Sequence, residues 1–312
     1  MIRGHSIRKN VPICIAVVAL CAVVSCNRGA EQKSKTFATP EEAVRALIEA
    51  AKASSVQDVV ALFGAEGQDL VDSADAATAR LNRQVFTVAV AERWQLQDQK
   101  DGSKVLVIGH ESWPFPVPLV KDAAGWRFDA AAGKEEVLAR RIGRNELAVI
   151  QVCRTYVVAQ QRYAETGHDG NPAGIYAARF QSEPGRQNGL YWPVERGGKR
   201  SPLGDLVAQA AEEGRPLGKD GEKPPFHGYY FKILTGQGAA APGGSKDYLA
   251  GRLMSGGFAL VAWPAQYDVT GVMTFVVNQD GVVHERDLGA ETTAAVKAMT
   301  LYDPDASWAR VQ

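Results

Sequence analysis

The stretch FALVAWPAQYDVTGVMTFVVNQDGVVHE, residues 258–285, decides the fold of the second half of the chain. Two β-rich runs in it flank Asn278-Gln279-Asp280-Gly281, a turn sequence typical of an antiparallel hairpin. Neighbouring runs of similar composition predict further strands, and a short helix follows them. The expected strands are 229–234, 258–263, 272–277 and 282–285, and the expected helix is 291–299. This order predicts an antiparallel sheet.

A long amphipathic helix is expected before this sheet, from Lys134 to about Ala164. Its apolar residues recur at helical spacing. They are Leu138, Ile142, Val149, Cys153 and Val157. Gly143 and Asn145 predict a break within the helix, and Gly167 suits the position just after its end. The second half is therefore expected to be a long helix packed on an antiparallel sheet with long Gly-rich loops.

The first half has a different pattern, with helices before strands. Thr39-Pro40-Glu41-Glu42 is typical of a helix start, and a second short helix is expected to end at Gly64. Strands should follow around the turn sequences Asp101-Gly102 and Asp122-Ala123-Ala124-Gly125. Their expected ranges are 85–90, 93–97, 104–108, 116–120 and 126–129. The whole chain is predicted to be α+β, with a small N-terminal domain of helices and an antiparallel sheet.

The chain begins with a segment typical of a signal peptide. Basic residues precede an uncharged apolar run, Val11 to Val24, which is too short for a comfortable membrane span. The run ends in Val23-Val24-Ser25-Cys26, which resembles the lipobox of bacterial lipoproteins. That resemblance implies cleavage before Cys26 and attachment of the protein to the membrane through N-terminal acyl chains. Asn27 follows, rather than the Asp that resembles an inner-membrane retention signal, which favours the outer membrane.

This interpretation divides the chain into four parts. Residues 1–25 are the signal peptide and 26–36 a polar tether, followed by domains at 37–133 and 134–312. The 35 basic and 35 acidic residues balance, but cleavage removes Arg3, Arg8 and Lys9 and leaves 32 basic against 35 acidic residues. A chain with a net charge of −3 is a poor candidate for a nucleic-acid binder that depends on phosphate neutralisation, so no nucleic-acid partner is expected.

The aromatic residues of the second half are the most suggestive candidate site. With the surrounding Gly and Pro they would suit a groove for a glycan or protein partner in the envelope. The candidate residues are Tyr191, Trp192, Tyr229, Tyr230, Trp263 and Tyr267. The alternative is that these rings pack under long loops. Strand alternation separates Tyr229 from Tyr230, so only one of these two can line such a groove.

Catalytic and metal-binding patterns are weak. Cys153 with His227 or His284 is a conceivable nucleophile and base, but Cys153 falls on the apolar stripe of the long helix. No HxH or HxxxH spacing occurs, and Glu285 with Asp287 is more typical of a solvated pair. The glycines of 236–244 do not form a phosphate-binding loop. We therefore expect no cofactor, no metal and no catalytic residue, and the question of enzymatic activity stays open with a leaning against it.

The second half contains several long motifs: GLYW at 189–192, SPLG at 201–204, HGYYFKILTGQG at 227–238, APGGSKDYL at 241–249, residues 256–289 and YDPDASW at 302–308. These motifs resemble a bacterial family catalogued only as domain of unknown function 2950. The resemblance extends from about residue 37 to the end of the chain and implies no activity. One departure is Asp268, where the family pattern has Gly after Tyr267, so a tight turn is expected to be altered there.

Two weaker likenesses concern architecture. The first half resembles the cone-shaped fold of the nuclear transport factor two superfamily, and NELAVIQVCRTYVVAQQRYAE at 145–165 resembles the helix of type IV pilins and pseudopilins. The pilin N-terminal helix and its cleavage site are missing. The expected function is a non-catalytic binding or scaffolding module on an outer-membrane lipoprotein that faces the periplasm. Two alternatives remain, an envelope hydrolase acting on glycan or peptide and an accessory subunit of a pilin-like or secretion apparatus.

Overall fold

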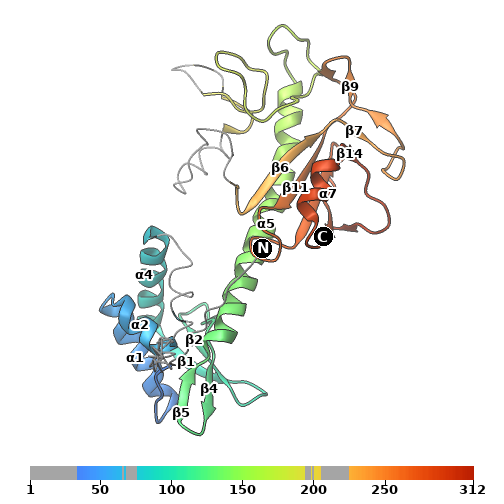
Figure 1. Cartoon of the computed structure of the whole chain (residues 1–312). Helices are drawn as coiled ribbons and strands as arrows, with labels where there is room; N and C mark the ends of the chain where they lie inside the picture. The colour runs from blue at the N-terminus through green and yellow to red at the C-terminus, as the bar shows by residue number, and fades with distance from the viewer. Residues whose placement is uncertain (1–33, 65–66, 68–75, 194–197, 199, 205–224) are drawn as a thin grey trace, which may run out of the picture.

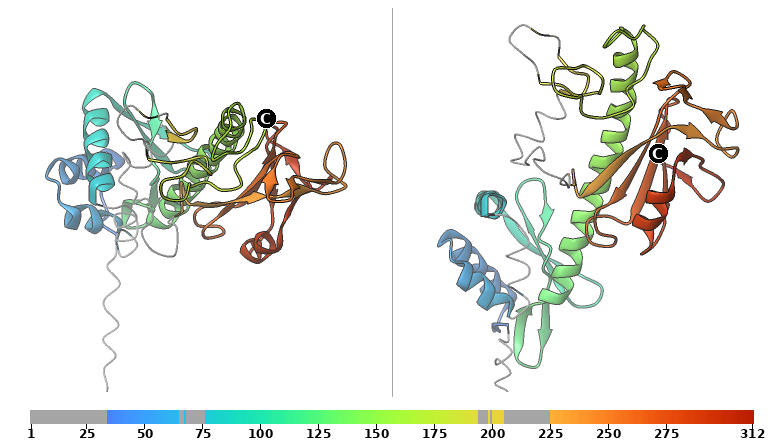
Figure 2. Two further views of the ribbon diagram at one scale, coloured as in Figure 1. Left: turned by 90° about the horizontal axis from the view of Figure 1, so that it is seen from above. Right: turned by 45° about the horizontal axis from the view of Figure 1, so that its top comes forward.

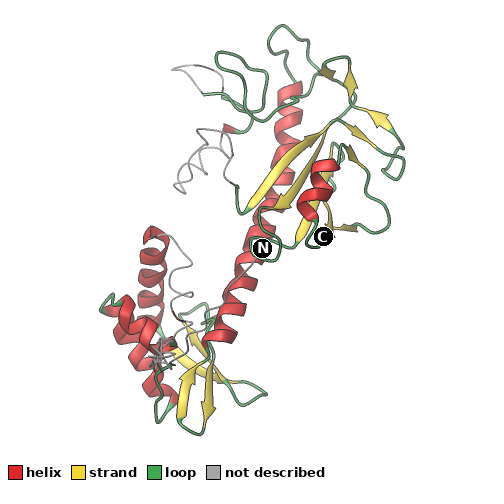
Figure 3. Cartoon of the chain, in the orientation of Figure 1, coloured by secondary structure: helices red, strands yellow, loops and turns green. Residues whose placement is uncertain are grey.

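The computed structural model describes residues 34–64, 67, 76–193, 198, 200–204 and 225–312. Two units with separate hydrophobic cores are joined by one long helix, α5 (Ala130–Ala164), which runs through both (Figure 1). The secondary structure is mixed, with helices and mostly antiparallel sheets in each unit (Figure 3). The prediction of an α+β fold is confirmed. The predicted signal peptide and Cys26 lie outside the described residues. Among the helices of the described ranges, none has the length and apolar character of a membrane span.

The N-terminal unit packs three helices against a twisted antiparallel sheet. Thr39 caps α1 as predicted, because its Oγ1 accepts a hydrogen bond from the Glu42 amide at 3.2 Å and Glu42 bonds back to the Thr39 amide. The strands follow the order β1-β2-β4-β5, with β3 paired to β2. The elements are α1 (Pro40–Lys52), α2 (Val56–Phe63), α4 (Ala76–Glu92), β1 (Trp94–Asp98), β2 (Lys104–Ile108), β3 (Trp113–Pro114), β4 (Leu119–Asp122) and β5 (Gly125–Phe128).

The predicted strand at 85–90 is wrong, because these residues belong to helix α4. Valine and aromatic residues favour strands, but packing against the sheet decides the outcome here. Phe86, Ala89 and Val90 lie against the core of the N-terminal unit, at the i, i+3 and i+4 spacing of a helix face. Val85 and Val88, which complete the β-rich pattern, are about 60% exposed. Tertiary contacts on one face have therefore overridden the local propensity.

Helix α5 begins and ends within four residues of the predicted helix, and it is continuous where a break was predicted. Gly143 remains helical, and no atom lies within 4 Å of the position that a Cβ would occupy. No neighbouring group therefore requires a glycine there. Asn145 also remains helical, and its side-chain amide donates a hydrogen bond to the Thr270 carbonyl at 2.8 Å. The proposed domain boundary at residue 134 lies inside this helix and stays a prediction.

The C-terminal unit is built on a five-stranded antiparallel sheet with the order β15-β13-β12-β11-β6. Every strand predicted for this half is present, each within two residues of its predicted start. Two small sheets extend the unit, β14-β7-β8 and β10-β9, and β14 pairs with β7 in parallel. The elements are β6 (Tyr229–Leu234), β7 (Gly236–Gln237), β8 (Lys246–Asp247), β9 (Leu249–Ala250), β10 (Leu253–Met254), β11 (Ala259–Pro264), β12 (Met273–Asn278), β13 (His284–Asp287), α7 (Thr292–Ala298), β14 (Leu301–Tyr302) and β15 (Ala309–Arg310).

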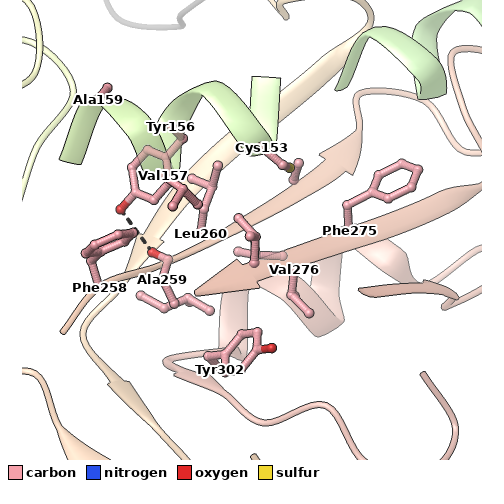
Figure 4. Close-up of a cluster of buried hydrophobic side chains, with 14 of the residues drawn as sticks. Cys153, Tyr156, Val157, Ala159, Phe258, Ala259, Leu260, Phe275, Val276 and Tyr302 are labelled. Atoms are coloured by element: carbon pink, nitrogen blue, oxygen red, sulfur yellow. Dashed lines mark hydrogen bonds between the residues drawn. The ribbon is translucent and has the colours of Figure 1, made fainter. Parts of the chain in front are cut away.

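Helices α5 and α7 cover opposite faces of this sheet (Figure 2, left). The α5 face carries Leu260 and Phe275, which lie beside Cys153 and Val157, whereas Val276 points to the other side, toward Tyr302 (Figure 4). The Tyr156 hydroxyl donates to the Ala259 carbonyl at 3.3 Å across the α5 face. The two faces therefore have different environments, and the candidate site lies on the α7 face.

Candidate functional site

Helix α7 is held over the sheet by a lysine of β6. The Lys232 ammonium donates hydrogen bonds to the carbonyls of Val296, Lys297 and Met299, at 3.1, 3.0 and 2.6 Å. These carbonyls lie at the C-terminal end of the helix, where a positive charge complements the helix dipole. The side chain of Val296, a residue of α7 itself, is fully buried. The end of α7 is thus fixed relative to the sheet, and with it one wall of the site.

A hollow of about 210 Å³ lies beside α7, between strand β13 and the segment 301–308. It is smaller than the roughly 300–1,000 Å³ of drug-sized ligand sites, so it suits a compact chemical group. Most of its lining is apolar, and Trp308, which is partly exposed, contributes the only aromatic ring of the lining. The lining residues are Val276, Arg286, Leu288, Ala295, Met299, Leu301, Asp303, Pro304, Asp305 and Trp308.

The charged groups of the hollow differ in how fully they are bonded. Asp303 Oδ1 accepts hydrogen bonds from the amides of Ala240 and Ala241, at 2.8 and 3.2 Å. Asp305 Oδ1 accepts from the Ser307 amide at 2.9 Å and from the Ser307 hydroxyl. These bonds from Ser307, and more weakly the positive charge of Arg286, lower the pKa of Asp305. Both carboxyl groups therefore already serve the local backbone.

Arg286 is different. Its side chain is half-buried on β13, and among the described residues its guanidinium has neither a hydrogen bond nor an ion pair within 4 Å. The charge of Arg286 lowers the pKa of the nearby Asp305, but the two side chains do not form an ion pair. A guanidinium has five N–H donors in a fixed planar arrangement that matches a carboxylate. The hollow therefore combines an unpaired guanidinium, which can bind an anion, with a mostly apolar lining.

Two further polar groups of the α7 face lack partners. The Thr274 hydroxyl and the Trp263 indole N–H are both buried, and neither has a hydrogen-bond partner in the described structure. Thr274 on β12 is paired with Arg286 on β13. On the other side of β12, Trp263 of β11 lies opposite Thr274, one position beyond the pair Ala262 and Phe275. Unpaired buried polar groups are uncommon and costly, and they often mark a functional or strained place.

The structure separates the six aromatic residues of the predicted groove. Tyr229 is fully buried on the α5 face, and Trp192 is 6% exposed in the core, near His168. Tyr230 and Trp263 lie together on the α7 face, with ring centroids 5.8 Å apart, and both are partly exposed. The Tyr267 hydroxyl bonds to the Asp287 carboxylate. Tyr191 packs at the edge of the core. Of the six, only the pair Tyr230 and Trp263 is brought into mutual contact.

Of the two bases considered for Cys153, His284 does not meet it, and His227 lies just before β6 with its ring 4.2 Å from that of Phe226. Cys153 is buried on the α5 face, where burial raises the pKa of its thiol to about 12. His284 lies on the opposite face and bonds through Nδ1 to the Tyr302 hydroxyl at 3.2 Å. Burial lowers the pKa of His284. No cluster of three or more His, Cys, Asp or Glu side chains suitable for a metal ion occurs in the described ranges.

Two carboxylates, Glu146 of α5 and Glu285 of β13, face each other between the helix and the sheet, a pairing that the sequence did not indicate. Glu146 Oε1 accepts hydrogen bonds from the amides of Val272 and Met273, at 2.8 and 2.9 Å, and from the Tyr229 hydroxyl at 3.4 Å. Burial, and then the negative charge of Glu146, raise the pKa of Glu285 on β13. Because Glu146 holds the start of β12, its bonding is that of a structural clamp between helix and sheet.

The N-terminal unit has a larger and more open groove of about 550 Å³, between the end of α1 and helix α4. It is lined by three cationic side chains, of Lys52, Arg80 and Arg83, and Lys52 pairs with Glu49 at 3.2 Å. Apart from the buried Ala51, its lining residues are exposed or half-buried, and none of the unpaired buried polar atoms of the described residues belongs to this lining. The hollow beside α7 is therefore the stronger candidate site.

Sequence reasoning did not single out Arg286 or Trp308. Both stand in motifs of the family resemblance, within residues 256–289 and 302–308, so the only signal was membership of a long motif. Nothing in their spacing indicates that residues 286 and 308 line one hollow, because this depends on the path of the chain after α7.

The chain was compared with protein families, curated proteins and solved structures. Neither the curated proteins nor the solved structures contain a match to the chain. A family match extends over residues 34–311 and so includes both units and the hollow beside α7. The chain belongs to the family described as Protein of unknown function (DUF2950).

Proposed function

We propose that this protein is an outer-membrane lipoprotein that faces the periplasm and acts as a non-catalytic binding or scaffolding module. The basic start, the short apolar run and the Val-Val-Ser-Cys sequence ending at Cys26 support the anchor. Two or three acyl chains would give stable attachment where one chain would be marginal. The polar residues 27–36 then serve as a tether between the membrane and the folded units.

The hollow beside α7 is the observation that carries the binding role. It combines an apolar floor, an aromatic edge and an unbonded guanidinium, which are the features of a ligand site. Cys153 and His284 lie on opposite faces of the sheet, and burial raises the pKa of the Cys153 thiol to about 12, which keeps it protonated. A site that can recognise a ligand, without a nucleophile beside it, favours binding over turnover.

Replacement of Cys26 tests the anchor. In cells that express the Cys26→Ser variant, the protein should move from the membrane fraction to the soluble fraction and should no longer incorporate labelled fatty acid. Cys153→Ala is the matched control, because it removes the other cysteine of the mature chain and leaves the lipobox intact. Continued fractionation of Cys26→Ser with membranes, or fatty-acid labelling of that variant, would show that the anchor is wrong.

A further inference from the structure

We propose that the hollow beside α7 binds the zwitterionic backbone of a short peptide, with its carboxylate on Arg286 and its ammonium group near Asp305. This inference rests on the proposed binding function and names the chemical class of its ligand. The hollow is formed by residues from β12, β13, α7 and the segment 301–308. It therefore exists only in the folded C-terminal unit.

The anionic end of the ligand is assigned from Arg286. This guanidinium is half-buried, lines the hollow and has no partner among the described residues. Withdrawing a cation from water without a partner costs free energy, and a bidentate carboxylate restores the lost hydrogen bonds. The fully buried Thr274 hydroxyl beside it is also unpaired, so the protein leaves polar groups unsatisfied at this place.

The cationic end is assigned from the two carboxylates of the hollow. Asp303 and Asp305 are exposed at its edge, and each uses only its Oδ1 in a hydrogen bond with the protein. With one guanidinium and two carboxylates, the hollow has a net charge of −1. A ligand that is only an anion would be attracted by Arg286 and repelled by both carboxylates. A ligand that carries an ammonium group as well complements all three charges.

The size and the apolar floor limit the rest of the ligand. A volume of about 210 Å³ accommodates a compact group rather than a long glycan. Leu288, Met299 and Leu301 provide apolar contacts, and Trp308 provides an aromatic surface. Leu301 is 44% exposed, so apolar area would be removed from water when a side chain binds. A dipeptide with one aliphatic side chain fits these requirements.

Calorimetric titration with three forms of one dipeptide tests the proposal. Alanyl-leucine has both charges, N-acetyl-alanyl-leucine only the carboxylate, and alanyl-leucine amide only the ammonium group. We expect the purified protein to bind the zwitterion at least tenfold more tightly than either blocked form. Arg286→Gln should abolish the preference for the free carboxylate, and Asp305→Asn, which keeps the acceptor for Ser307, should reduce the preference for the free amine.

Arg310→Gln is the matched control, because this exposed arginine lies on the neighbouring strand β15 and does not line the hollow. It should bind alanyl-leucine as the unchanged protein does. Absence of binding by folded protein, equal affinity for the three forms, or unchanged binding by Arg286→Gln would each overturn the proposal. Binding is measured on purified protein, so failure of the membrane anchor would leave these affinities unchanged, and failure of the hollow would leave the fractionation unchanged.

Discussion

The two faces of the C-terminal sheet differ in how completely their polar groups are paired. On the α5 face, the fully buried Gln160 uses its whole amide, bonding to the Tyr156 hydroxyl and to both backbone groups of Ala177. On the α7 face, the Thr274 hydroxyl and the Trp263 indole N–H are buried without partners, and Arg286 has none among the described residues. The Gln160 amide on the α5 face is thus fully paired, whereas the α7 face contains a hollow and unpaired polar groups beside it.

This difference indicates how the unit divides its tasks. A completed polar network stabilises the fold and fixes the position of α5, because each buried group would be costly to leave unpaired. An incomplete network costs stability, and natural proteins tend to accept such a cost where they bind something. The comparison therefore predicts that removal of the paired Gln160 amide lowers stability and that removal of the unpaired Thr274 hydroxyl raises it.

The largest effect is expected on the α5 face. Gln160→Leu would remove three hydrogen bonds and leave the amide and carbonyl of Ala177, a residue 2% exposed, without partners. We expect a loss of about 2–4 kcal/mol in the free energy of unfolding, measured by urea denaturation. Gln151→Leu, at an exposed position of the same helix, is the control and should change stability by less than about 0.5 kcal/mol. A loss for Gln160→Leu no larger than that of the control would break the comparison.

The opposite sign is expected on the α7 face. Thr274→Val keeps the shape of a fully buried side chain and removes a hydroxyl that has no partner. We expect the free energy of unfolding to rise by about 1 kcal/mol, because a desolvated polar group is replaced by a methyl group.

Thr292→Val provides the matched control on the same side of the sheet. Thr292 is 1% exposed, but its hydroxyl donates to the Gly289 carbonyl at 2.6 Å. This variant should lose about 1 kcal/mol. If Thr274→Val is destabilised as much as Thr292→Val, the Thr274 hydroxyl has a partner in solution and the two faces are equally complete.

A third effect concerns the loop that joins β11 to β12 at the end of the sheet. Asp268 has a φ of +59°, a left-handed conformation that glycine adopts without steric cost. The turn expected to be altered by this residue is therefore formed, with strain. Asp268→Gly should raise the free energy of unfolding by about 0.5–1 kcal/mol, as measured by denaturant titration. Asp268→Ala should give no gain, and a gain as large as that of glycine would show that strain is not the cause.

The elements that the sequence predicts well are those with local signals. The cap at Thr39, the turn at Asn278-Gln279-Asp280-Gly281 and the stripe through Val149 and Cys153 each specify one structure through neighbouring residues. Residues 85–90 failed because a β-rich composition and a helical burial pattern coexist there, and the core selected the helix.

The site was less predictable than the fold. The sequence directed attention to aromatic residues, and the structure buries Tyr229 and Trp192 in the core. The hollow forms only after α7 and β14 have brought the segment with Trp308 back to strand β13, which carries Arg286. Such a meeting is a property of tertiary structure, and a guanidinium without a partner is recognised only when all its neighbours are known.

The smallest effect is expected from Glu285, a half-buried carboxylate on the α5 face of strand β13. Burial and the nearby Glu146 raise the pKa of Glu285, so the folded protein binds a proton at this carboxylate more strongly than the unfolded chain does. At pH 7 the ionised carboxylate therefore lowers stability, and this penalty fades as the pH falls through the raised pKa. Glu285→Gln should raise the melting temperature by about 1–2 °C at pH 7, and the gain should shrink toward zero near pH 4.

Glu111→Gln, at an exposed turn of the N-terminal unit, is the control for this last variant and should show neither the gain nor its pH dependence. A pH-independent gain for Glu285→Gln would point to packing instead of charge. A loss would mean that Glu285 is stabilised by a partner, and that the pairing of polar groups on the α5 face extends to its carboxylates. The pH profile of this difference thus tests whether Glu285 is unpaired on the α5 face, as the two threonine variants test whether Thr274 is unpaired on the α7 face.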